Sequence, residues 1–120
     1  LEAKKKCVDF VLLHRIMWSS RNPSRPMIPG RNDPRIFRAP LSYQDDVIEI
    51  VSNLLRLGVE DPAIDETIEY IVGKRNERGS WNLEATPNNM YTTWGKPGEE
   101  SKWVAFRVIR LLSLAGSLDL

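Results

Sequence analysis

IDETIEYIVGKRNERGSW, residues 64–81, is the stretch of this chain that decides its fold. Its apolar residues Ile64, Ile68 and Ile71 recur at helical spacing, so they share one face of an expected helix. The apolar pattern then stops, and a polar segment leads through Gly79 to the tryptophan that closes the stretch. These residues predict a helix with an abrupt end, followed by a loop that carries a large aromatic side chain.

Outward from this stretch, the apolar periodicity predicts an all-α domain of about four helices. The expected helical regions are residues 2–18, 42–57, 61–75 and 101–115. Asp61 followed by Pro62 is a clear start signal, because aspartate caps the first amides and proline fits the first helical position. Ser42 and Ser101 are the expected caps of the second and fourth helices, with Gly58 and Gly116 as their stops.

The second and fourth regions are apolar on more than one face, whereas the third has a narrow apolar stripe and one charged side. We therefore expect helices that alternate between outer and inner positions, as two stacked helical hairpins. We treat residues 1–120 as one domain with three parts. These are a helix with a loop rich in proline and arginine (1–41), a helical pair (42–75), and a loop rich in glycine and tryptophan with the final helix (76–120).

A helix that ends in K-R-N-x-x-G-x-W and leads to a second amphipathic helix resembles the repeat of terpenoid cyclases and protein prenyltransferases. The motif of that superfamily is written roughly Q-x-x-x-G-x-W. Gly79 and Trp81 match it, and Arg75 stands in place of the glutamine. The resemblance extends over residues 36–115 and implies an α/α toroid, of which four helices are only a part. It also implies that Trp81 pins its loop against the next helix.

Arg75, Gly79 and Trp81 are thus expected to be structural residues. Because a guanidinium group donates hydrogen bonds and cannot accept them, we expect Arg75 to bind carbonyls or a carboxylate such as Glu99 or Glu100.

Residues 43–46 read Y-Q-D-D, where class II terpenoid cyclases carry the acid motif D-x-D-D. The resemblance makes Asp45 and Asp46 candidate catalytic acids, with Tyr43 in place of the first aspartate. The alternative, which we favour, is that both carboxylates lie in the first turn of a helix and stabilise its dipole. We therefore expect both groups to be ionised at neutral pH, with no cyclase chemistry from this chain alone.

Aromatic residues gather near the expected start of each inner helix, where a toroid cavity would open. We take Tyr43, Tyr91, Trp94 and Trp103 as candidate ligand-binding residues. Aromatic faces attract cations, so such a lining suits a carbocation or an apolar ligand. A purely structural role for these side chains is the alternative.

The sequence predicts no metal ion and no cofactor. Cys7 and His14 lie seven residues apart on one expected helix, about 10 Å along its axis, which is too far for one tetrahedral ion. We expect both to be buried in the core. The loop of residues 19–41 holds five of the eight prolines and a cluster of arginines. An anion site is conceivable there, but a solvated loop held by ion pairs is favoured.

The composition of the chain limits the kinds of partner that we expect. A formal net charge of +1 gives no field that would attract nucleic acid, and no apolar run approaches the ~20 residues of a membrane span. A single cysteine favours a reducing, cytoplasmic location. Inner helices with an uncovered apolar side predict either self-association or a longer parent chain.

The leading functional hypothesis is a prenyltransferase-like or squalene-cyclase-like domain whose cavity binds an apolar or isoprenoid ligand. The alternative is a non-catalytic helical-repeat module that uses its exposed face for protein contacts.

Overall fold

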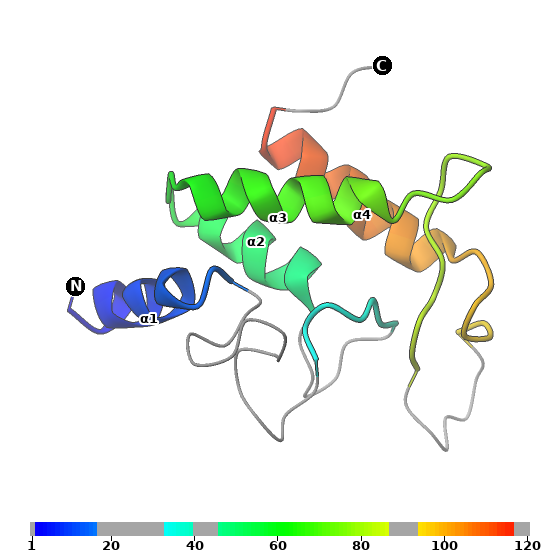
Figure 1. Cartoon of the computed structure of the whole chain (residues 1–120), viewed down its shortest axis with the longest axis horizontal. Helices are drawn as coiled ribbons and strands as arrows, with labels where there is room; N and C mark the ends of the chain where they lie inside the picture. Colours follow the sequence, from blue (N-terminus) through cyan, green and yellow to red (C-terminus); the bar gives the residue numbers. More distant parts are fainter. Residues whose placement is uncertain (1, 17–32, 40–45, 87–93, 117–120) are drawn as a thin grey trace.

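The computed structural model describes residues 2–16, 33–39, 46–86 and 94–116. Within these residues the chain forms four helices and no strand (Figure 1). The helices are α1 (Glu2–Leu13), α2 (Val47–Arg56), α3 (Pro62–Gly73) and α4 (Lys102–Leu114). The expected all-α fold is confirmed. Among the candidate site residues, Tyr43, Asp45 and Tyr91 lie outside the described residues, as does Ser42.

The predicted starts of α3 and α4 are confirmed. The side chain of Asp61 accepts a hydrogen bond from the amide of Ala63 at 2.9 Å, and Pro62 occupies the first helical position. The hydroxyl of Ser101 accepts from the amide of Val104 at 3.2 Å. Each oxygen satisfies an amide that has no partner within its own helix.

The predicted stops of α2 and α4 are confirmed as well. Gly58 has φ 77° and Gly116 has φ 70°, the left-handed conformation that glycine adopts without steric cost. Each glycine directly follows the C-cap residue of its helix, Leu57 for α2 and Ala115 for α4.

The predicted start of α2 was wrong. Asp46 is the N-cap of α2 and has extended backbone angles, so it lies before the first turn rather than inside it. Its side chain accepts from the amide of Glu49 at 3.1 Å. Aspartate caps a helix as well as serine does, and Asp46 directly precedes the apolar run that begins at Val47.

The predicted extent of the first helix was also wrong, since α1 ends at Leu13 rather than at residue 18. Arg15 and Ile16 turn the chain with φ values of 50° and 71°, and the amide of Ile16 bonds the carbonyl of Val11 at 2.9 Å. The side chain of Ile16 is fully buried. The turn is made without glycine, so the sequence pattern contains no stop signal there.

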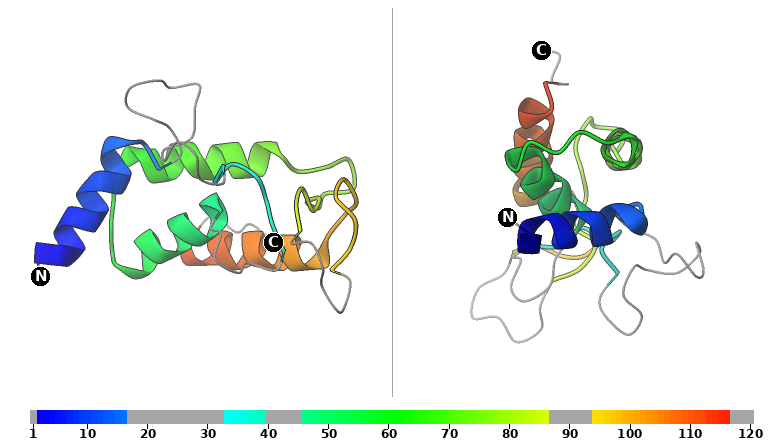
Figure 2. Two further views of the ribbon diagram at one scale, coloured as in Figure 1. Left: turned by 90° about the horizontal axis from the view of Figure 1, so that it is seen from below. Right: turned by 90° about the vertical axis from the view of Figure 1, so that its left-hand side faces the viewer.

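Helix α2 lies at the centre of the packing, against both α3 and α4, and α1 lies at one end of the molecule (Figure 2). This agrees with the expectation that the second helix is buried on two sides. The core is aliphatic and includes Val47, Ile48, Val51, Leu54, Ile64, Ile71, Val104, Val108 and Leu111. Helix α1 has no buried residue and touches this core through half-buried side chains.

Three non-helical segments join beside the start of α4. The amide of Leu83 bonds the carbonyl of Glu99 at 2.8 Å, and the amide of Gly98 bonds the carbonyl of Leu83 at 2.7 Å. The amide of Glu84 bonds the carbonyl of Phe37 at 2.9 Å. Residues 33–39 and 94–101 are thus both fixed to residues 81–86, which positions the loop that carries Trp94.

Candidate functional site

Helix α4 has one buried face and one exposed apolar face. Val104, Val108 and Leu111 are fully buried against the core. On the other side, the exposed fractions are 43% for Trp103, 62% for Phe106, 46% for Ile109 and 45% for Leu114. Because residues three apart are neighbours on a helix, Trp103, Phe106 and Ile109 form one continuous stripe.

An open groove of about 830 Å³ runs beside this stripe. Its apolar lining consists of Trp94, Trp103, Ala105, Phe106 and Ile109. Its charged lining consists of Arg78, Glu100 and Lys102. The volume lies within the range of roughly 300–1,000 Å³ that small-molecule sites occupy. Predominantly apolar walls with a few polar groups are typical of such sites.

Two of the candidate ligand-binding residues meet in this groove. The ring centroids of Trp94 and Trp103 lie 4.9 Å apart, with an angle of 56° between the ring planes. Aromatic pairs prefer such a tilted contact to a flat sandwich. The two indoles come from different segments, one from the loop before α4 and one from its first turn. They form a corner with two aromatic walls.

The groove is lined by two positively charged side chains and one negatively charged side chain. The guanidinium of Arg78 and the carboxylate of Glu100 form an ion pair at 3.6 Å. Lys102 forms no ion pair within the part of the chain that the structure describes, and its Nζ lies 5.0 Å from the centre of the Trp103 ring. A lysine over an indole face is held by cation–π attraction. Among the described residues, one positive charge of the groove is therefore without a carboxylate partner.

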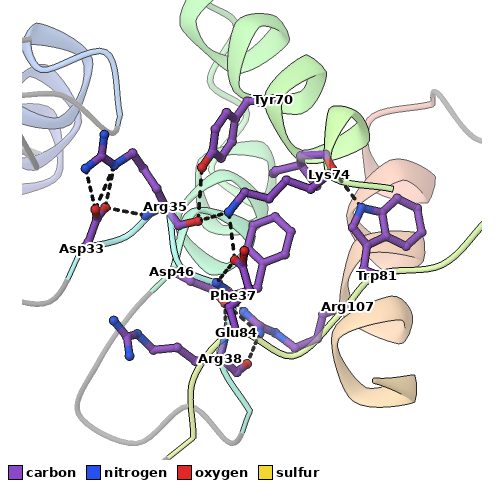
Figure 3. Close-up of polar contacts among 11 residues, drawn as sticks. Asp33, Arg35, Phe37, Arg38, Asp46, Tyr70, Lys74, Trp81, Glu84 and Arg107 are labelled. Atoms are coloured by element: carbon purple, nitrogen blue, oxygen red, sulfur yellow. Dashed lines mark hydrogen bonds and ion pairs between the residues drawn. The ribbon is translucent and has the colours of Figure 1, made fainter. Parts of the chain in front are cut away.

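Asp46, the candidate acid that the structure describes, does not line the groove, and other residues bind its carboxylate (Figure 3). Its side chain is fully buried, and both carboxylate oxygens accept hydrogen bonds from Arg107 of α4, one of them at 2.9 Å from Nη1. The amide of Arg38 also donates to Asp46, at 3.3 Å. A two-pronged bond between guanidinium and carboxylate is among the strongest in proteins. Asp46 thereby ties the start of α2 to the middle of α4.

The motif residues after α3 form a compact corner. Trp81 is only 4% exposed, and its indole Nε1 donates to the carbonyl of Ile71 in the last turn of α3 at 2.8 Å. Gly79 has φ 78°, and a Cβ atom there would lie 3.2 Å from a guanidinium nitrogen of Arg75. The guanidinium carbon of Arg75 lies 6.0 Å from the centre of the Trp81 ring.

The predicted partner of Arg75 was wrong. Glu100 pairs with Arg78 instead, and Arg75 lies over Gly79 and Trp81. The absence of a side chain at residue 79 leaves room for this arrangement.

A second polar cluster joins residues 33–39 to α3, and the sequence pattern contained no signal for it (Figure 3). The ammonium of Lys74 donates to Glu84 at 2.8 Å and also to the carbonyl of Arg35, and it lies 4.3 Å from the centre of the Phe37 ring. The hydroxyl of Tyr70 bonds the same carbonyl at 3.3 Å. The hydrogen bonds to the carbonyl of Arg35 hold this end of the arginine-rich loop to α3 and to Lys74 after it.

Asp33 and Arg35 form an ion pair within that segment, at 2.5 Å. Partial burial of Asp33 acts to raise its pKa, but hydrogen bonds and charge from Arg35 outweigh it, so the pKa lies below its ordinary value. The hydrogen bond to Asp33 correspondingly raises the pKa of Arg35.

The expected burial of Cys7 was wrong, since this cysteine is exposed on α1. His14 is half-buried and its ring meets Phe10 edge-on at 4.6 Å. Across the described residues, no three histidine, cysteine, aspartate or glutamate side chains lie close enough to hold a metal ion. None of the helices described has the length and apolar character to cross a membrane.

Comparison with protein-family models, with curated proteins and with solved structures found no match to this chain. The assignment of a function therefore rests on the groove and its chemistry.

Proposed function

We propose that this chain is a binding domain that takes an apolar ligand in the groove beside α4, without catalysing a reaction on it. The observation that carries the proposal is the aromatic corner of Trp94 and Trp103, continued by Phe106 and Ile109 along an exposed helix face. An isoprenoid chain is the ligand that the resemblance to terpenoid cyclases and prenyltransferases suggests. On the same resemblance we propose that the four helices are part of an α/α toroid.

The physical reason is the free energy of covering exposed apolar surface. Each Å² removed from water contributes about 25 cal/mol, and aromatic side chains offer the largest areas. Trp103, Phe106 and Ile109 remain more than two-fifths exposed in the folded chain. A branched hydrocarbon chain that lies along them would cover all three at once.

Cyclase chemistry is not part of the proposal. A cyclase acid has to donate its proton to an apolar substrate, so it must be protonated and reach the cavity. Asp46 is buried, accepts hydrogen bonds from a guanidinium and two backbone amides, and is not among the residues that line the groove. These contacts tie the carboxylate to α4 and to the start of α2, which supports a structural role.

Titration with farnesol, a neutral isoprenoid alcohol, tests the proposal through isothermal calorimetry. We expect saturable binding at one site. Phe106→Ala should weaken it about five- to tenfold, the loss expected from a partly covered phenylalanine. Phe10→Ala is the matched control, since Phe10 is an exposed phenylalanine on α1 outside the groove, and should leave the affinity unchanged. Absence of saturation, or an equal loss in both variants, would reject the proposal.

One observation favours a second function, protein contact. Beyond the groove, α4 also exposes Leu114, and the exposed apolar side chains of α4 together also suit contact with a helix of another protein or of a second copy. Two measurements on the same variants separate the two functions. A protein-contact face predicts self-association in sedimentation equilibrium that both Leu114→Gln and Phe106→Ala weaken. A small-molecule groove predicts that, in calorimetry, Phe106→Ala weakens farnesol binding and Leu114→Gln does not.

A further inference from the structure

This inference rests on the proposed function and specifies the ligand. We propose that the groove prefers a single-chain amphiphile with one carboxylate, of the fatty-acid class. The carboxylate would bind at Lys102, and the chain would lie along Trp103, Phe106 and Ile109.

The charge of the groove selects the head group. Of the three charged residues that line it, Arg78 and Glu100 form an ion pair with each other. The third, Lys102, has no carboxylate partner among the described residues, and its ammonium lies over the Trp103 ring. A carboxylate at this point would gain an ion pair without having to displace an existing one. A cationic head group would instead be repelled.

The direction of α4 adds to this preference. Lys102 is the first residue of a thirteen-residue helix, and the dipole of a helix makes its N-terminal end favourable for anions. From Trp103 the apolar stripe leads away from that end, and six residues to Ile109 span about 9 Å of helix axis. An amphiphile whose carboxylate lies at the positive end of α4 would therefore place its hydrocarbon chain along the apolar stripe.

A single spare cation favours a carboxylate over a polyphosphate. Phosphate groups are typically bound by several donors, often by bidentate arginine. Arg78, the arginine in this groove, is already opposite Glu100. No group of three metal-ligating side chains is present in the described residues to neutralise further negative charge.

Three probes with the same ten-carbon chain test the inference: decanoate, decanol and decyltrimethylammonium, each below its micelle concentration and measured by calorimetry at neutral pH. We expect decanoate to bind about two- to fivefold more tightly than decanol, the range that an exposed ion pair supplies, and the cationic probe to bind most weakly. The advantage of decanoate should shrink as salt is added.

Lys102→Gln should remove the preference, so that decanoate and decanol bind with equal affinity. Lys96→Gln is the matched control, because Lys96 is an exposed lysine of the neighbouring loop that does not line the groove, and it should retain the preference. If all three probes bind equally, or if Lys102→Gln keeps the advantage of decanoate, the inference is overturned while the proposed function stands. If neither decanoate nor decanol binds, both are rejected.

Discussion

Trp81 and Trp103 show how two tryptophans of one chain take opposite roles. The indole of Trp81 is buried in the core and donates its N–H to the carbonyl of Ile71 in the last turn of α3. The indole of Trp103 is nearly half exposed and contacts Trp94 at the edge of the groove. Burial decides the difference, because a side chain contributes to stability in proportion to the surface that folding removes from water.

Trp81→Ala should lower the free energy of unfolding by about 3–5 kcal/mol, since it removes a large buried ring and leaves a cavity. Urea unfolding followed by circular dichroism measures this change. Trp103→Ala is the control and should alter stability by less than about 1 kcal/mol, as exposed substitutions do. Similar losses of stability in the two variants would show that Trp81 does not anchor the loop after α3 in the core.

Asp46 offers a second comparison at this scale, because both it and Asp61 are N-cap aspartates. Asp61→Ala should cost about 1 kcal/mol, the usual value for a lost cap. Asp46→Ala should cost about 3–5 kcal/mol, because it also leaves the charge of Arg107, only 19% exposed, without its carboxylate partner. Equal losses in urea unfolding would mean that the bond to Arg107 adds nothing to stability.

At the scale of elements, the ends of the helices were the features most open to prediction. Asp61 with Pro62, Ser101, Gly58 and Gly116 act through local backbone geometry, so their meaning can be read from a few neighbouring residues. The end of α1 could not be predicted, because Arg15 and Ile16 adopt the left-handed conformation only through the burial of Ile16 in a core built by distant segments.

The same contrast separates the parts of the site. A tryptophan at the start of an apolar helix identifies Trp103 as a candidate without any tertiary information. The bond between Asp46 and Arg107 joins residues sixty-one positions apart, and the contact of Lys74 with the carbonyl of Arg35 spans thirty-nine. Neither pairing follows from periodicity, since the first depends on how α2 packs against α4 and the second on how residues 33–39 lie against the end of α3.

The loop after α3 gives a prediction for an element as a whole. Gly79→Ala should destabilise the chain by about 1–2 kcal/mol, because φ 78° is unfavourable for alanine and its Cβ would crowd Arg75. Gly73→Ala, in the last position of α3 with open space around it, should be neutral or stabilise by up to about 1 kcal/mol. Thermal unfolding of the two variants compares them directly. A tolerated alanine at position 79 would contradict the role assigned to that turn.

At the scale of the whole molecule, the central position of α2 determines which surfaces remain free. Because α2 packs against both α3 and α4, its own apolar residues are covered, whereas α4 is covered on one side alone. The loop of residues 94–100, fixed by its bonds to Leu83, then places Trp94 beside the free side of α4. The groove is thus a product of the packing order of the helices together with one anchored loop.

Binding of an apolar chain at α4 is tested most directly by the indole N–H signals of nitrogen-15-labelled protein, assigned with single Trp→Phe variants, during titration with decanoate. We expect the signals of Trp94 and Trp103 to shift together and to saturate at one equivalent. The signal of Trp81 should stay in place, because its N–H is buried and bonded to Ile71. Unchanged Trp94 and Trp103 signals at saturating decanoate, or a shift confined to Trp81, would contradict the assignment of the groove as a binding site.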